Sequence, residues 1–88
     1  MGASITKYYM GTNEPDDVLN NILAQFPDVS YSEVDVSDKP QLIRELNLKT
    51  FPSLIGIGIS GYSLLVHGRG SEQILTKVMR DLVTHEDG

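Results

Sequence analysis

The chain of 88 residues carries 12 acidic and 7 basic side chains, which gives a formal net charge of −5, and it contains no cysteine. This length supports one compact domain, and the lack of cysteine excludes a disulfide framework, a thiolate nucleophile and a thiolate-bound metal. The negative charge disfavours nucleic acid or an anionic membrane as a direct partner, so a basic protein surface is the better electrostatic match. The chain shows no signal peptide and no apolar run near the roughly 20 residues that cross a bilayer, so we expect a cytoplasmic protein.

The first third of the chain predicts a strand followed by a helix. Residues 4–10 are rich in β-branched and aromatic side chains and stop at Gly11, which is typical of a strand and a turn. Apolar residues recur at helical spacing over residues 18–26. Thr12 or Asn13 is expected to cap this helix, because both side chains can accept a hydrogen bond from its first turn.

The middle of the chain predicts an edge strand and a short helix. Residues 29–36 alternate between apolar and polar side chains, and this one-sided polarity suits the edge of a sheet. A helix of two to three turns should start at residues 38–40 and be closed by Asn47.

The last third predicts a β-hairpin and a helix. Residues 53–59 form a strand too apolar to face water on either side, and the chain returns as residues 62–67 after a turn at residues 60–61. Residues 74–83 carry the clearest helical stripe of the chain, with Ser71 as the expected cap.

The order is therefore β-α-β-α-β-β-α within a single α/β domain over residues 1–88. The first two strands, being parallel, need a right-handed crossover through the first helix. We expect a four-stranded mixed sheet with helices on both faces, and a loose acidic tail over residues 84–88.

Three local matches make the chain resemble the thioredoxin and glutaredoxin superfamily over residues 5–83. Residues 34–54 are similar to the family's strand, acidic turn, short helix and proline loop. Within them, Thr50-Phe51-Pro52 is similar to the family's cis-proline loop, and Gly68-Arg69-Gly70-Ser71 is similar to the glycine turn that opens its last helix. The resemblance implies the minimal thioredoxin fold and a cis peptide bond before Pro52.

The family's Cys-x-x-Cys motif is absent. The family places it at the start of the first helix, where this chain has about Thr12-Asn13-Glu14-Pro15. Neither Thr nor Pro supplies the thiolate that thiol-disulfide exchange needs, so the oxidoreductase activity does not carry over. His67 and His85 are too isolated for a metal site, and the sequence offers no catalytic constellation. We therefore expect neither an enzyme nor a cofactor.

The resemblance implies a partner-binding groove. In family members the backbone beside the cis-proline pairs with an extended peptide or with glutathione. This would assign Thr50, Phe51 and Pro52 to a groove that has Thr12 and Asn13 opposite. The simpler interpretation is that Pro52 only shapes the chain and Phe51 only packs.

A second candidate site is the start of the last helix. The backbone N–H groups of Gly70 and Ser71 could hold a carboxylate or phosphate, with Arg69 adding charge. An ordinary helix cap is the simpler interpretation of these residues.

The third candidate is an acidic surface on the first helix, the second strand and the loops between them. Neighbouring elements would gather these carboxylates into an imitation of nucleic-acid phosphates that competes for a basic DNA-binding protein. Acids at helix starts are routine, however, and scattered charge usually means a solvated face. The residues concerned are Glu14, Asp16, Asp17, Asp28, Glu33, Asp35 and Asp38.

The sequence thus predicts a redox-inactive thioredoxin-like module that binds a protein partner and regulates, scaffolds or inhibits it. The alternative is the acidic mimic of nucleic acid, and the third hypothesis is a thiol-independent binder of glutathione or a small anion. An exposed edge strand can also pair with its own copy, so a homodimer is a further hypothesis.

Overall fold

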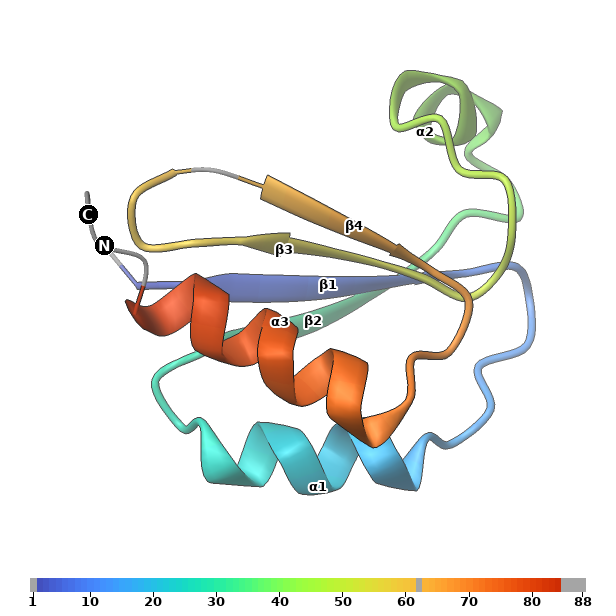
Figure 1. The fold of residues 1–88 in the computed structure, drawn as a ribbon. Coiled ribbons are helices and arrows are strands. Elements are labelled where there is room, and N and C mark those ends of the chain that lie inside the picture. Colours follow the sequence, from blue (N-terminus) through green and yellow to red (C-terminus); the bar gives the residue numbers. More distant parts are fainter. Residues whose placement is uncertain (1, 62, 85–88) are drawn as a thin grey trace.

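The computed structural model describes residues 2–61 and 63–84, which form four strands and three helices. These are β1 (Ser4–Tyr9), α1 (Asp17–Gln25), β2 (Ser30–Asp35), α2 (Pro40–Glu45), β3 (Ser53–Ile57), β4 (Ser63–His67) and α3 (Glu72–Thr84). One mixed sheet has the order β2-β1-β3-β4, with β1 parallel to β2 and antiparallel to β3, and β3 antiparallel to β4 (Figure 1). The predicted α/β class and element order are confirmed, and β2 lies at the sheet edge.

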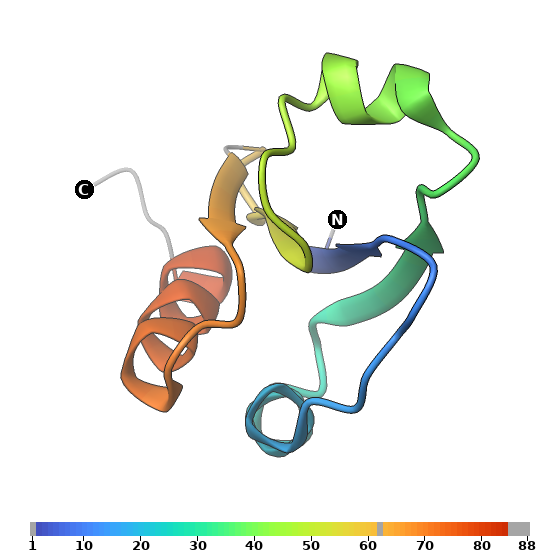
Figure 2. The same ribbon diagram turned by 90° about the vertical axis from the view of Figure 1, so that its right-hand side faces the viewer.

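The two faces of the sheet are covered unequally. Helices α1 and α3 pack along one face, whereas α2 lies on the opposite side near one end of the strands (Figures 1 and 2). We call these the covered face and the open face. The core lies between the covered face and its two helices, because the apolar side chains of all three meet there and leave water. Its most buried members are Ile5, Leu19, Ile22, Leu54, Leu75, Met79 and Leu82.

Helix α1 begins later than the sequence predicted. Asp16 is its N-cap, and the Asp16 carboxylate accepts a hydrogen bond from the Leu19 N–H at 3.1 Å. The expected caps Thr12 and Asn13 instead belong to the loop between β1 and α1. That loop is tied to the rest of the domain at its far end, where Arg69 donates to the Pro15 carbonyl. A carboxylate next to the first turn also suits the helix dipole.

Helix α2 begins where expected but has only six residues, fewer than the expected two to three turns. Pro40 occupies the first turn, where its missing N–H costs nothing, and Asn47 follows the helix with a φ of 56°, a left-handed conformation that Asn tolerates. The peptide bond between Phe51 and Pro52 is cis, as the resemblance implied.

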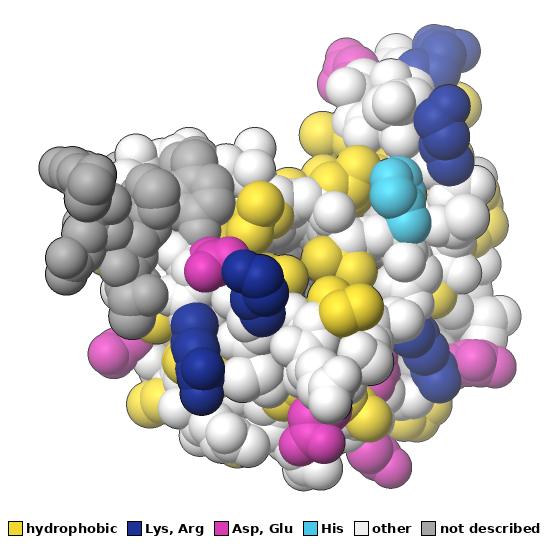
Figure 3. Space-filling model, in the orientation of Figure 1, with side chains coloured by type: hydrophobic (Ala, Val, Ile, Leu, Met, Phe, Trp, Pro, Cys, Tyr) yellow, Lys and Arg dark blue, Asp and Glu magenta, His cyan; other side chains and the backbone are white. Residues whose placement is uncertain are grey.

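The expectation that residues 53–59 avoid water on both sides is wrong. Ile57 and Ile59 are 46% and 44% exposed, whereas Ser53 is fully buried. Ser53 lies at the end of β3 nearest α2, and its hydroxyl bonds the Thr50 carbonyl, whereas the short α2 does not extend toward the other end of β3 (Figure 1). Ile57 and Ile59 therefore stay in contact with solvent. Figure 3 shows apolar side chains at the surface in the hollow beside α2.

Helix α3 supplies most of its predicted stripe to the core. The Ser71 hydroxyl accepts from the Ile74 N–H at 3.2 Å, which confirms the predicted cap. Ile74 itself is 52% exposed, contrary to its place in the stripe, because it lies in the first turn beside the cap. Thr84 ends the helix and so does not begin a loose tail, while residues 85–88 of that tail lie outside the described residues. Within the described ranges, no helix has the length and apolar character needed to span a bilayer.

Candidate functional site

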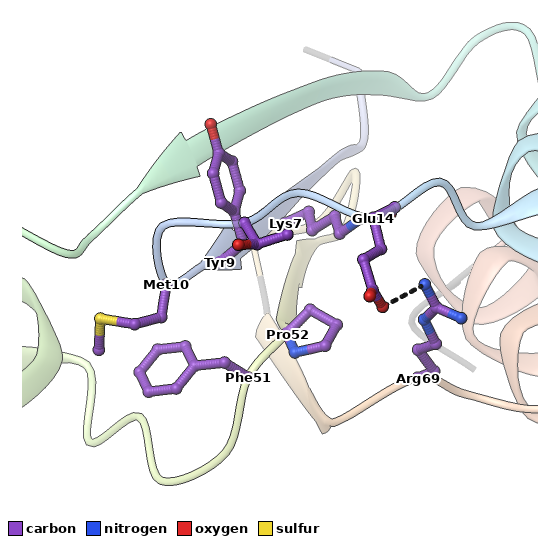
Figure 4. Close-up of a pocket in the computed structure, with 8 residues that line it drawn as sticks. Lys7, Tyr9, Met10, Glu14, Phe51, Pro52 and Arg69 are labelled. Carbon is purple, nitrogen blue, oxygen red and sulfur yellow. Dashed lines mark hydrogen bonds and ion pairs between the residues drawn. The ribbon is translucent and has the colours of Figure 1, made fainter.

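A pocket of about 270 Å³ opens where β1 ends, beside the cis-proline loop (Figure 4). Three segments that are distant in sequence form it: the end of β1 with the loop that follows, the loop before β3, and the loop after β4. The lining residues are Lys7, Tyr9, Met10, Thr12, Glu14, Phe51, Pro52 and Arg69.

The pairing of β1 with β3 brings these loops together. In the antiparallel register Tyr8 lies opposite Ser53, so the chain just beyond Tyr8 meets the chain just before Ser53, where Pro52 is. The Ser53 hydroxyl donates to the Thr50 carbonyl and holds the loop between them. Gly11 has a φ of +78°, which lets the chain turn away from the end of β1.

Asp35 fixes the turn after β1 to the end of β2. Its carboxylate accepts hydrogen bonds from the Ser37 N–H at 2.9 Å and the Gly11 N–H at 3.0 Å. These bonds favour the ionised form, so they lower the pKa of Asp35, with Ser37 the largest cause. One carboxylate thus sets the positions of two loops at the rim of the site.

One wall of the pocket is apolar. The Met10 side chain is 42% exposed and lies beside the ring of Phe51, and Pro52 continues the same wall (Figure 4). A partly exposed methionine next to an aromatic ring is an adaptable contact surface, because the thioether is flexible and polarisable.

The other wall is charged. Lys7 is only 3% exposed, and its Nζ donates to the Glu14 carbonyl at 3.0 Å. The Glu14 carboxylate pairs with the Arg69 guanidinium at 3.5 Å, and Arg69 also donates to the Pro15 carbonyl at 2.9 Å. Glu14 therefore contacts both cations, one through its backbone and the other through its side chain (Figure 4).

The structure gathers three of the five predicted groove residues. Thr12, Phe51 and Pro52 line the pocket, whereas Thr50 and Asn13 do not. The Asn13 amide turns toward β2 and donates to the Glu33 carboxylate at 2.9 Å.

Sequence reasoning missed Lys7, Tyr9 and Met10 as lining residues. For Lys7, the alternation of side chains between the two faces of β1 could have predicted its position. Ile5 and Lys7 are two residues apart and therefore share the covered face.

The seven predicted surface acids lie in different environments. Asp16 is 9% exposed and caps α1, so it does not contribute to an exposed surface. Asp17 and Asp28 are exposed, while the Asp38 carboxylate lies 3.6 Å from Lys39 and the Glu14 carboxylate pairs with Arg69. The remaining two, Glu33 and Asp35, hold local structure on β2.

Glu33 is bonded on both carboxylate oxygens. One accepts from Asn13 and the other from the Tyr31 hydroxyl at 2.8 Å. Partial burial raises the pKa of Tyr31 above its ordinary value, and the hydrogen bond and charge of Glu33 and the charge of Asp16 add to the effect.

The three residues of the predicted anion site at the start of α3 do not act together in the structure. Ser71 caps the helix, and Gly70 packs so closely that a Cβ there would lie 2.9 Å from Leu75 Cγ. Arg69 points instead into the pocket beside the cis-proline. The two residues at the helix start therefore have structural roles, and the charged one joins the pocket.

Comparisons with known proteins identify the fold. No family model matches the chain, and no curated protein matches it. Mitochondrial thioredoxin 3 from Saccharomyces cerevisiae superposes with a TM-score of 0.72 and 21% identity, covering 91% of this chain and 78% of the other. A thioredoxin from Trypanosoma brucei brucei gives 0.72 and 19% over 94% and 76%, and DsbF of MTB gives 0.73 and 13% over 93% and 81%. The chain therefore has a thioredoxin-like fold and, having no cysteine, lacks the Cys-x-x-Cys motif.

Proposed function

We propose that this chain is a redox-inactive thioredoxin-like module that binds a protein partner through the pocket beside the cis-proline and thereby regulates or inhibits that partner without catalysis. The observation that carries the proposal is the apolar wall of Met10, Phe51 and Pro52, which leaves a large flexible side chain exposed at the pocket mouth. A fold whose reactive atoms are missing keeps its surfaces, and this pocket combines an apolar wall with a charged one.

The chemistry of the wall suits a peptide segment with an apolar side chain. Met10 exposes 42% of its surface, and covering it with a partner removes apolar area from water. The backbone around Pro52 is held by the β1–β3 pairing and by the Ser53–Thr50 hydrogen bond. A preformed site of this kind costs little ordering entropy when a partner binds.

Affinity capture with matched variants tests the proposal. The chain is used as bait in a bacterial lysate, and the captured proteins are identified by mass spectrometry for the wild type, for Met10→Ser and for Phe51→Ala. Ile74→Ser is the control, because Ile74 is also an exposed apolar residue but is not among the residues that line the pocket. The proposal expects one salt-resistant partner that both pocket variants lose and the control retains. A partner retained equally by all variants would contradict it.

The same experiment distinguishes the second candidate function, the acidic mimic of nucleic acid, from binding through the pocket. It requires partners that are basic nucleic-acid-binding proteins, that salt or added DNA removes, and that reversal of Asp17 and Glu33 abolishes. We place it second because Asp16 is buried and the carboxylates of Glu33 and Asp35 are engaged in local hydrogen bonds. Sedimentation of the purified chain tests the homodimer separately.

A further inference from the structure

Lys7 is a buried cation with incomplete hydrogen bonding. It is 3% exposed, and among the described residues its Nζ has one acceptor, the Glu14 carbonyl. An ammonium carries three N–H donors, so two of them have no acceptor among residues 2–61 and 63–84. None of the ion pairs in the described part of the chain includes Lys7. Buried charges are normally paired, because moving a charge out of water is costly.

The acidic residue opposite Lys7 on the neighbouring strand is engaged elsewhere. Glu33 is the cross-strand partner of Lys7 in the β1–β2 register, so a direct pair between them would be the simple solution. The Glu33 carboxylate instead accepts from Asn13 and Tyr31. Lys7 thus has no ion-pair partner among the described residues, and it lines the pocket with its Nζ beside the Glu14 carbonyl.

A second cation lies in the same pocket. Arg69 is 3.5 Å from the Glu14 carboxylate, whose side chain is 74% exposed. Lys7, Arg69 and Glu14 are the charged residues among those that line the pocket, which makes its local charge positive. A positive pocket in a chain of net charge −5 is unexpected unless it receives an anion.

We propose that this pocket binds an oxyanion, either a phosphate or a carboxylate. Lys7 Nζ supplies a buried positive charge to the site. When the ligand binds, Arg69 releases the exposed Glu14 carboxylate and pairs with the oxyanion instead. Glu14 is then a built-in competitor that occupies Arg69 when no anion is bound. Thr12 lines the same cavity and supplies a hydroxyl that can donate to an anion oxygen.

Titration with inorganic phosphate tests the site in the full chain. Amide shifts are followed by NMR at constant ionic strength, with sodium chloride replacing phosphate in the reference series. We expect saturable shifts at Thr12, Glu14 and Arg69. Shifts that do not saturate, or that chloride reproduces, would overturn the proposal when acetate and a peptide carboxylate, titrated in the same way, give the same result.

Two pocket variants and one control assign the binding to the charged wall. Lys7→Met should weaken phosphate binding by about tenfold or more, because it removes charged hydrogen bonds. Lys77→Met is the matched control, since Lys77 is an exposed lysine on α3, and it should leave the affinity unchanged. Glu14→Gln should raise the affinity several-fold by removing the competing carboxylate. Equal affinity of wild type and Lys7→Met would overturn the role of Lys7. If Lys7→Met fails to fold, unchanged or weaker binding by Glu14→Gln overturns the proposal instead.

The source of the oxyanion is distinguished by parallel titrations with acetate and with a short peptide that has either a free or an amidated C-terminus. Tightest binding of phosphate indicates a free anion, and binding of the free-acid peptide but not its amide indicates a peptide carboxylate. Failure of phosphate, acetate and free-acid peptide alike overturns the proposal. The anion site uses the charged wall, so its outcome is independent of the partner capture, which reads Met10 and Phe51 on the apolar wall.

Discussion

The covered and open faces of the same sheet differ sharply in how their side chains are used. On the covered face Ile5 and Leu54 are at most 2% exposed beneath α1 and α3. On the open face Ile57 is 46% and Leu65 is 39% exposed, and α2 has no fully buried residue. The comparison shows that one face with its two helices carries the core, while the other face contributes little burial.

Because the core lies on the covered face, the loops at the end of β1 contribute little to it. The free energy of unfolding is concentrated in the layer between the covered face and its helices, since that is where apolar area leaves water. The pocket lies at the edge of that layer, and of its lining residues only Lys7 is fully buried. Substitutions at the pocket mouth should therefore change binding more than stability.

The largest expected effect comes from truncating the covered core. Met79→Ala should lower the free energy of unfolding by about 2–5 kcal/mol, because it removes a fully buried side chain and leaves a cavity. Leu65→Ala on the open face should cost less than about 1 kcal/mol, since Leu65 already contacts water. Urea unfolding of both variants measures the difference. Equal losses would mean that the open face is covered in solution, for example by a second copy.

A smaller loss is expected from adding one methyl group to the covered face. A Cβ at Gly56 would lie 2.8 Å from Leu82 Cδ1, and Leu82 is fully buried and has little room to move. Gly56→Ala should therefore cost about 1–3 kcal/mol by overpacking. Gly2→Ala is the control, because its nearest contact is an ordinary 3.5 Å. A neutral Gly56→Ala would show that α3 can shift away from the sheet.

The same division explains what the sequence could predict. The element order followed from periodicity, and the cap at Ser71 and the left-handed residue Asn47 after α2 followed from local chemistry. The exposure of Ile57 could not be read from the chain, because it depends on how far α2 reaches over the open face. The charged wall of the pocket was equally hidden, since Lys7 and Arg69 come to the same pocket only through the fold, and the motif around Arg69 pointed to the start of α3 instead.

The pH dependence of stability at high pH shows whether Tyr31, at the edge of the covered face, is buried. Its pKa is raised by burial and by Glu33, so folding favours the protonated hydroxyl. The resulting stability is fully present below the unfolded-state pKa of about 10 and is lost as the pH rises toward the folded-state pKa. The wild type should lose stability above about pH 10 more steeply than Tyr31→Phe. Urea unfolding across this pH range measures both slopes, and parallel slopes would show that Tyr31 is solvated like an unfolded tyrosine.

The smallest expected effect is on stability at low pH, where protonation of Asp35 weakens its hydrogen bonds at the exposed rim of the pocket. Its pKa is lowered by hydrogen bonds from Ser37 and Gly11, so the stability it contributes is present above the unfolded-state pKa and is lost as the pH falls through the folded-state pKa. Asp35→Asn should therefore flatten the decline in urea midpoint on acidification below about pH 4. Asp28→Asn is the control, because the Asp28 carboxylate accepts no hydrogen bond from the described residues. An equal decline in all three proteins would mean that the Gly11 turn is held by the β1 backbone rather than by Asp35.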